Sequence, residues 1–205
     1  MSYLVIGGTG RTGRQVVDQL RAQGHAVVIG TRRPRGDDAV AVDLAQPLPV
    51  GVLDDIAGVV VSVEPPVDAA GADAVMNRGI ARLAGLAGAR QIQLVLLSQI
   101  YITRAEQHPE LAGIIRARAA GEQAVRDSGA PYTIVRPAWL TDAPATGHRL
   151  EQGDRGDGKV SRETVARAAV AALLHPAARG KTFELYDDAN AQDWATGFAE
   201  LLLDR

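Results

Sequence analysis

The sequence VIGGTGRTG, from Val5 to Gly13, decides the fold of this 205-residue chain. An apolar run, Tyr3–Ile6, leads into glycines spaced as Gly7-x-x-Gly10-x-x-Gly13, and an amphipathic segment follows. Such a strand, turn and helix leave unpaired N–H groups at a helix N-terminus, where negative charge is favoured. Gly7 permits the tight turn, Gly10 lets phosphates approach the backbone, and Gly13 lets the helix pack on the strand. The stretch predicts a dinucleotide pyrophosphate site, the alternative being a glycine-rich turn that binds nothing.

Apolar runs and amphipathic segments alternate along the rest of the chain. We expect strands at 3–6, 26–30, 40–42, 58–63, 91–98, 132–136 and 182–186. We expect helices at 11–23, 70–86, 111–127, from a cap at Ser161 to about 175, and after a cap at Asn190. Alternation of this kind predicts a parallel sheet with helices on both faces. We therefore predict an α/β fold: one doubly wound, Rossmann-like domain over residues 1–205, with about six or seven strands in the order 3-2-1-4-5-6 plus a seventh.

Composition narrows the class of protein. Hydrophobic residues make up 46% of the chain and charged residues 22%, as expected of a globular protein. The net charge of −2 gives no reason to expect a nucleic-acid partner or an anionic membrane surface. Cysteine is absent and the four histidines are far apart, so we expect no metal site. These features predict a cytoplasmic protein with a small-molecule substrate and no membrane segment.

The residues after the second expected strand bear on the choice of dinucleotide. Thr31-Arg32-Arg33 carries no Asp or Glu, the residue that an NAD site uses to bind the ribose 2′-hydroxyl. Arg32, Arg33 and Arg11 can each bind a 2′-phosphate. We expect NADP(H) rather than NAD(H), the alternative being that these arginines are solvated surface. Asp43, after the third strand, is a candidate acceptor for the adenine amino group, or a turn residue.

On these residues the chain resembles the atypical short-chain dehydrogenase/reductases, in the NmrA-like, NAD(P)-binding branch that includes small flavin reductases. The resemblance covers nearly the whole chain. It is carried by GGTGRTG (7–13), TRRP (31–34), Asp43-Leu44, LVLLS (94–98), the block at 121–142 and GKTFEL (180–185). It implies that Pro137 and its neighbours line the nicotinamide end of the site. It also implies cofactor-binding roles for Gly7, Gly10, Arg11, Thr12, Gly13, Arg32, Asp43, Leu44, Ser62 and Val63.

The catalytic residues of the wider family are only partly present. That family uses Ser with Tyr-x-x-x-Lys, in which the lysine lowers the tyrosine pKa so that the phenol exchanges a proton with a carbonyl. Here Ile114 and Arg118 occupy the tyrosine and lysine positions, while Ser98 remains at the end of the fifth strand. Ser98 is a candidate donor to a substrate oxygen or to the nicotinamide amide. Arg118 keeps a positive charge near the nicotinamide ribose but cannot donate a proton at neutral pH.

Further candidates lie in the loops that follow the strands. Tyr101 is a candidate to replace the missing phenol, and Trp139 and Leu140 are candidates for an apolar wall of the substrate mouth, or plain core. The loops at 100–109 and 143–158 could act as mobile lids. We interpret four side chains in these loops as solvated surface: His108, His148, Asp154 and Asp157.

Three functions are compatible with these residues. The first, which we favour, is an NADPH-dependent oxidoreductase of a quinone, a flavin or a similar acceptor, for which proximity supplies most of the catalysis. The second is a non-redox tailoring enzyme, an isomerase or cyclase. The third is a non-catalytic NADP(H)-sensing regulator of the NmrA type, in which the nucleotide biases binding to a partner protein. A homodimer is also open.

Overall fold

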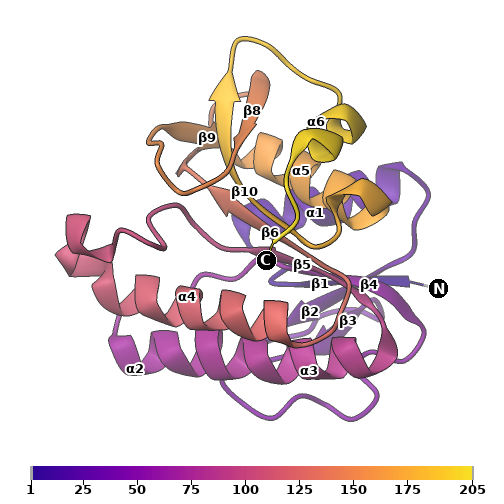
Figure 1. The fold of residues 1–205 in the computed structure, drawn as a ribbon. Helices are drawn as coiled ribbons and strands as arrows, with labels where there is room; N and C mark the ends of the chain where they lie inside the picture. The colour runs from indigo at the N-terminus through magenta and orange to yellow at the C-terminus, as the bar shows by residue number, and fades with distance from the viewer. Residues whose placement is uncertain (1, 205) are drawn as a thin grey trace.

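A central sheet of eight strands is covered by helices on both faces in the computed structural model, which describes residues 2–204 (Figure 1). The first part of the chain forms β1 (Ser2–Ile6), α1 (Arg11–Ala22), β2 (Val27–Thr31), β3 (Ala39–Ala41), β4 (Ile56–Val61), α2 (Ala69–Ala72), a π-helical segment (Asp73–Gly79), α3 (Ile80–Arg90) and β5 (Gln93–Leu97). The second part forms α4 (Ala112–Asp127), β6 (Tyr132–Pro137), β7 (Trp139–Thr141), β8 (Gly147–Glu151), β9 (Lys159–Ser161), α5 (Arg162–Leu174), β10 (Lys181–Asp188) and α6 (Trp194–Glu200). Short 3₁₀ turns lie at Ala105–Gln107, Pro109–Leu111 and Pro176–Ala178.

The strand order is β3-β2-β1-β4-β5-β6-β10-β8, which confirms the predicted doubly wound topology with its seventh strand. Only the edge strand β8 is antiparallel, paired with β10. It gives the sheet one strand more than expected, because it lies in the segment that the sequence indicated as a loop. A separate parallel pair, β7 and β9, was also not expected. β8 reads GHRLE and lacks the apolar run that marks the central strands.

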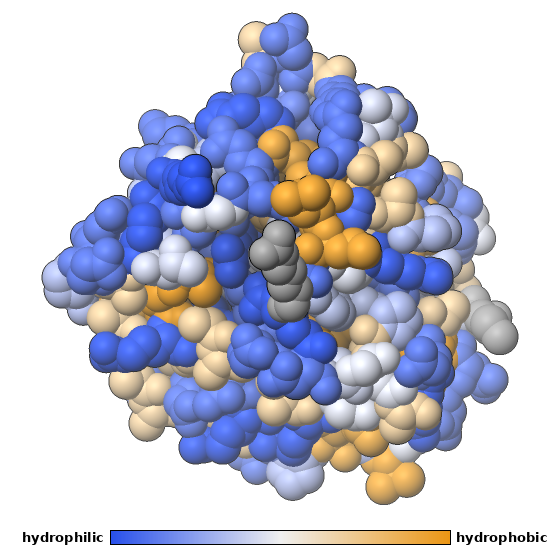
Figure 2. Space-filling model, in the orientation of Figure 1, coloured by the Kyte–Doolittle hydropathy of each residue, from blue (hydrophilic) through white to orange (hydrophobic). Residues whose placement is uncertain are grey.

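The central strands are buried on both faces, because alternate residues of each strand point to opposite sides of the sheet. In β1, Leu4 and Ile6 join the cluster under α2, α3 and α4, whereas Val5 joins the cluster under α1 and α5. In β5, Leu96 and Val95 divide in the same way. Hydrophilic side chains cover most of the molecular face in Figure 2. The apolar runs in the sequence therefore correspond to a core on each side of one sheet.

The glycine turn after β1 positions the N-terminus of α1. Gly7 has a φ of +83°, and a Cβ there would lie 2.0 Å from the carbonyl oxygen of Ser62, at the end of β4. A Cβ on Gly13 would lie 2.2 Å from the carbonyl oxygen of Gly7. Only glycine fits where backbone approaches backbone this closely. The turn thus sets α1 against the edge of the sheet where β1 and β4 end.

A buried ionic network joins α4 to β6 and β10. The Arg136 guanidinium donates to both carboxylate oxygens of Glu122, at 3.0 and 2.6 Å, and to Glu184 at 3.0 Å. Arg126 donates to the second oxygen of Glu122 at 3.0 Å. Burial disfavours the charge of Arg136, but hydrogen bonds and attraction from Glu122 and Glu184 outweigh it and raise its pKa. The network gives Glu122 and Arg136 of the 121–142 block a structural role.

Two of the side chains interpreted as solvated are buried. The Asp154 carboxylate, 1% exposed, accepts the backbone N–H groups of Tyr101 and Thr103, each at 2.7 Å. The His148 ring, 8% exposed, stacks on Trp194 with ring centroids 3.6 Å apart. The solvated interpretation was wrong for both because their partners lie tens of residues away, where no local pattern reveals them. The Asp154 bonds also tie together the two loops that we expected to act as lids.

The terminal helix begins later than predicted. Asn190 does not cap it; Asp193 does, accepting the N–H of Thr196 at 3.1 Å. Asn190 instead belongs to a turn, with its N–H donated to Asp188 and its carbonyl accepting from His148. Asp and Asn are both good caps, so the sequence alone did not separate them.

Glu122→Gln tests the buried network. The substitution removes the carboxylate that faces Arg136 and Arg126, and breaking a buried pair from one side costs about 3–5 kcal/mol. We expect a loss of that order in the free energy of unfolding, measured by urea titration with circular dichroism. Asp54→Asn is the control, since Asp54 pairs with Arg90 on the surface, where a pair contributes about 0–1 kcal/mol. Equal losses in the two variants would contradict the role of the network.

Gly7→Ala tests the turn. The new Cβ meets the Ser62 carbonyl in a left-handed conformation, so we expect a loss of at least about 1 kcal/mol. That loss lowers the Tm by at least about 3 °C in a thermal melt. Gly85→Ala is the matched control, because nothing lies within 4 Å of a Cβ at Gly85 in α3 and alanine favours helix. An unchanged Tm for Gly7→Ala would show that the turn has room to relax.

Candidate nucleotide-binding site

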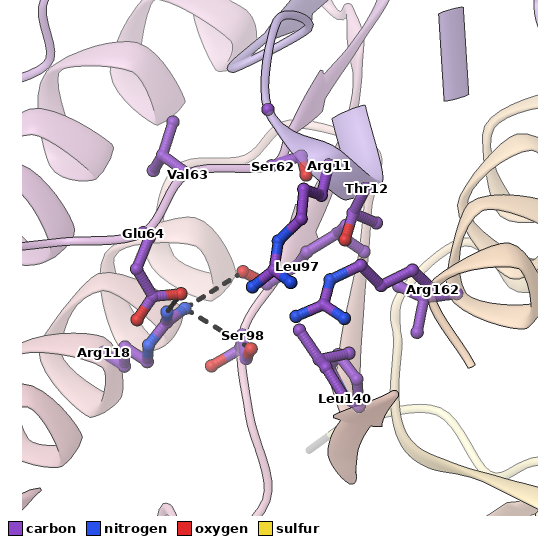
Figure 3. A pocket seen from close by; sticks show the side chains of 13 residues that line it. Arg11, Thr12, Ser62, Val63, Glu64, Leu97, Ser98, Arg118, Leu140 and Arg162 are labelled. Atoms are coloured by element: carbon purple, nitrogen blue, oxygen red, sulfur yellow. Dashed lines mark hydrogen bonds and ion pairs between the residues drawn. The ribbon is translucent and has the colours of Figure 1, made fainter. Parts of the chain in front are cut away.

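A cavity of about 250 Å³ opens at the carboxyl ends of β1, β4, β5 and β6 (Figure 3). Ligands of doubly wound sheets bind at this edge. Ligand pockets usually measure roughly 300–1,000 Å³, so this cavity is at the small end for a ligand site. Its lining is Gly10, Arg11, Thr12, Ser62, Val63, Glu64, Leu97, Ser98, Arg118, Pro137, Leu140, Arg162 and Val165.

Most of the candidates from the sequence come together in this lining. The glycine turn contributes its second glycine, Arg11 and Thr12, and the end of β4 contributes Ser62 and Val63. Gly7 and Gly13 lie just behind the lining and shape the turn. The nicotinamide-end candidates in the lining are Ser98, Arg118 and Pro137, and the substrate candidate is Leu140.

Ser98 and Arg118 form the floor of the cavity. Arg118 donates from Nη1 to the carbonyl oxygens of Leu97 and Ser98, at 3.2 and 3.3 Å, and its Nη2 lies 3.8 Å from the Glu64 carboxylate (Figure 3). The Ser98 hydroxyl, in a residue 6% exposed, and the Arg118 Nε have no hydrogen-bond partner in the described protein. Buried polar atoms rarely lack partners, so this floor fits a ligand with oxygen acceptors, as a nicotinamide riboside has.

Arg118 differs chemically from the lysine of the wider family. Burial lowers the pKa of its guanidinium, and the charges of Glu64 and Glu122 oppose that shift. Arginine nevertheless stays a cation at neutral pH. Ile114, at the tyrosine position, is buried in the core under α4. The floor therefore offers a fixed positive charge and a hydroxyl, and the cavity lining within residues 2–204 contains no phenol.

Tyr101 lies in an aromatic cluster with His108 and Trp139. Its ring centroid is 4.2 Å from that of His108 and 6.0 Å from that of Trp139, and the Arg104 guanidinium sits above it. Burial raises the pKa of Tyr101, and the nearby Asp157 carboxylate adds to that shift. Neither Tyr101 nor Trp139 is among the residues that line the cavity.

The mouth also holds an arginine that the sequence reasoning missed. Asp142, just after β7, accepts from Arg162 at 2.7 Å and from Arg11 at 3.1 Å. Arg162 is the first residue of α5, directly after its cap Ser161. The available signal was this position: a basic residue in a first helical turn, where acidic residues are preferred. Glu64 was also missed, although it directly follows Val63 in the candidate set.

The remaining cofactor candidates lie toward the carboxyl end of β2 and β3. Arg32 and Arg33 are exposed, and the ion pairs of residues 2–204 do not include them. Asp43 has one carboxylate oxygen in a turn, accepting the N–H of Ala45 at 2.9 Å. Leu44 is buried, and its carbonyl accepts from Arg82.

The described part of the chain contains neither a metal-binding cluster nor a membrane-spanning helix. Within residues 2–204, no three His, Asp or Glu side chains lie close enough together to hold a metal ion. In the same range, no helix combines the length and the apolar character needed to cross a bilayer.

Comparisons with known proteins agree with this geometry. A family model for NAD(P)H-binding proteins matches residues 7–176. An uncharacterized chloroplastic protein of Arabidopsis thaliana is 30% identical over an alignment of 215 residues, gaps included. The alignment covers 91% of this chain and 77% of that protein. The (4-alkanoyl-5-oxo-2,5-dihydrofuran-3-yl)methyl phosphate reductase of Streptomyces griseus is 31% identical, over 88% of this chain and 66% of its own length. The cytoplasmic location stays a prediction.

Solved structures share the fold. A Bacillus halodurans protein described as an NAD-dependent epimerase/dehydratase superposes with a TM-score of 0.86 at 22% identity, over 98% of this chain and 100% of that one. A Streptococcus pneumoniae protein described as an NADH-flavin reductase gives 0.76 at 17% identity, over 92% and 100%. The chain therefore belongs to the NAD(P)H-binding family, and its motifs resemble those of the atypical short-chain dehydrogenase/reductases.

Proposed function

We propose that this protein is an NADPH-dependent reductase of a small acceptor such as a quinone or a flavin. The observation that carries the proposal is the floor of the cavity, where the Ser98 hydroxyl and the Arg118 guanidinium face the space beside the glycine turn. Two similar proteins have names that fit a redox role: the Streptomyces griseus phosphate reductase and the Streptococcus pneumoniae protein described as an NADH-flavin reductase.

The cofactor would supply a hydride, and the residues of the chain would bind and orient both reactants. The N–H groups at the start of α1 would hold the pyrophosphate. Ser98 would donate its hydroxyl hydrogen to an oxygen of the nicotinamide amide or of the acceptor, and Arg118 would stabilise negative charge that develops above the floor. Overall, NADPH, a proton from water and the oxidised acceptor would give NADP⁺ and the two-electron-reduced acceptor.

The absence of a phenol in the lining favours an acceptor that can be reduced without a proton from a protein side chain. Ile114 cannot donate a proton, and Arg118 does not release one at neutral pH. A carbonyl reduced to an alcohol needs a proton at its oxygen during the reaction. A quinone or a flavin spreads the incoming charge over a conjugated ring and takes its proton from water. Orientation of the two rings would then supply most of the rate.

NADP(H) preference rests on Arg32 and Arg33. Arg32→Gln/Arg33→Gln removes two guanidinium groups that can bind the 2′-phosphate, so we expect NADPH to bind about 10- to 100-fold more weakly. NADH, which lacks that phosphate, should bind unchanged. Thermal shift against nucleotide concentration measures both affinities. Arg116→Gln, at an exposed position of α4, is the control. A wild type that binds NADH more tightly than NADPH would overturn the preference.

Ser98→Ala tests the floor. We expect kcat for NADPH oxidation by a quinone or flavin to fall about tenfold, the effect of one lost transition-state hydrogen bond of about 1.4 kcal/mol. NADPH affinity should change by less than about threefold. Ser128→Ala, which removes a hydroxyl at the end of α4 far from the cavity, should leave kcat unchanged. Wild-type kcat in Ser98→Ala with every active acceptor would remove Ser98 from the reaction.

A second candidate function is favoured by Ile114 at the tyrosine position: a non-catalytic regulator that senses NADP(H) and signals to a partner protein. The two functions separate on one result. If NADPH binds tightly and no acceptor in a quinone and flavin panel oxidises it, the reductase proposal fails. A sensor or a non-redox isomerase or cyclase would then account for the fold.

A further inference from the structure

We propose that Arg162, together with Arg11, forms an oxoanion site at the mouth of the cavity that binds a phosphate group on the acceptor. The assignment of this anion to an acceptor rests on the proposed reductase function. The ligand class is therefore a flat ring system that carries a phosphate monoester.

The contact of Asp142 with the two arginines shows that the mouth accepts a carboxylate. One Asp142 oxygen accepts from Arg162 at 2.7 Å and the other from Arg11 at 3.1 Å. The same carboxylate thus bridges guanidinium groups from two separate helices, α5 and α1. Phosphate oxygens have the charge and the acceptor geometry to make the same pair of contacts.

The exposure of the partners indicates which of them can be displaced. The Arg162 side chain is 10% exposed, so its guanidinium is held in place at the mouth. The Asp142 side chain is 66% exposed and follows a three-residue strand, so it can turn into solvent. An entering phosphate would replace Asp142 without any further desolvation of Arg162. Asp142 then acts as an internal stand-in for the anion.

The charge of the cavity supports an anionic ligand beyond the cofactor pyrophosphate. Three guanidinium groups line it, on Arg11, Arg118 and Arg162. The two carboxylates nearest to them, Glu64 and Asp142, are 80% and 66% exposed. The cofactor pyrophosphate would have its own donors, the N–H groups of the glycine turn. Figure 3 shows Arg162 entering from α5 on the side opposite Arg118, next to Leu140.

The position of Arg162 points to the acceptor rather than the cofactor. The cavity, at about 250 Å³, is smaller than the roughly 300–1,000 Å³ usual for a ligand pocket, so we expect the nicotinamide to fill much of it and the acceptor ring to extend to the mouth. There Leu140, which is 39% exposed, lines the cavity and offers an apolar wall. A ring against this wall places its substituent near the Arg11–Asp142–Arg162 group.

FMN and riboflavin are the probes, since they share one ring system and differ in the phosphate. Their affinities are measured by flavin fluorescence on protein saturated with NADP⁺, so that no turnover occurs. We expect wild type to bind FMN about tenfold more tightly than riboflavin. Arg162→Gln should bring the ratio close to one, and Arg162→Lys should restore part of it. Asp142→Asn, which keeps Arg162 and removes the competing carboxylate, should raise the ratio.

Arg167→Gln is the matched control, one and a half turns along α5 in an exposed pair with Glu163, and it should keep the wild-type ratio. Circular dichroism checks the fold of each variant. If Arg162→Gln does not fold, Asp142→Asn still tests the site, because it is expected to raise the FMN-to-riboflavin affinity ratio. Equal affinities of wild type for the two flavins would overturn the proposal. So would an Arg162→Gln variant that binds NADP⁺ more weakly with an unchanged flavin ratio, since Arg162 would then hold the cofactor phosphates.

If neither flavin binds, inorganic phosphate replaces them. It should raise the Tm of NADP⁺-saturated wild type but not of saturated Arg162→Gln, and equal shifts in the two would overturn the anion site. The reductase proposal fails separately, when no acceptor oxidises NADPH. The two proposals can therefore fail independently. Phosphate binding without NADPH oxidation would overturn only the reductase proposal, and NADPH oxidation without phosphate binding would overturn only the anion site.

Discussion

The contact between the glycine turn and the end of β4 fixes the site, because two backbone segments meet there with no side chain between them. Gly7 lies against the Ser62 carbonyl, and Gly13 lies against Gly7. These contacts set the height of α1 above the sheet, and with it the direction of the N–H groups that face the cavity. Arg11 and Thr12 reach the cavity only because α1 begins at this place.

The buried ionic network fixes the floor of the cavity. Glu122 and Arg118 lie four residues apart on α4 and therefore on one helix face. Arg136 and Arg126 hold Glu122 against β6 and β10, so the same face of α4 is held one turn earlier, where Arg118 meets the carbonyls of Leu97 and Ser98. Stability and site geometry thus depend on the same helix face. Glu122 and Arg136 of the block at 121–142 therefore contribute to the site indirectly, through the position of α4, whereas Pro137 and Leu140 of the same block line the cavity.

The parts of the fold that the sequence predicted are those with strong local signals. The central strands are apolar on both faces, and the glycine spacing marks the first turn. These two signals were enough to predict the topology and most of the residues that line the cavity. β8 was not predicted because its residues are largely polar. The burial of Asp154 and His148 was not predicted because their partners are remote in sequence. Arg162 was missed because its place at the mouth depends on how α5 docks beside α1, and the one local signal was its unusual position as a basic residue in a first helical turn. Substrate chemistry depends on such long-range placements, so it is the least predictable part.

The antiparallel strand β8 has a consequence for the behaviour of the protein in solution. Without it, the parallel sheet would end at β10, a strand of eight residues whose outer N–H and C=O groups would be unpaired. Such an edge is a template for pairing with another chain. β8 covers it with a short strand in which Arg149 bonds to Glu151 and lies over the Tyr186 ring. Loss of this strand would therefore first appear as aggregation, in a protein whose cofactor cavity, at the ends of other strands, was still intact.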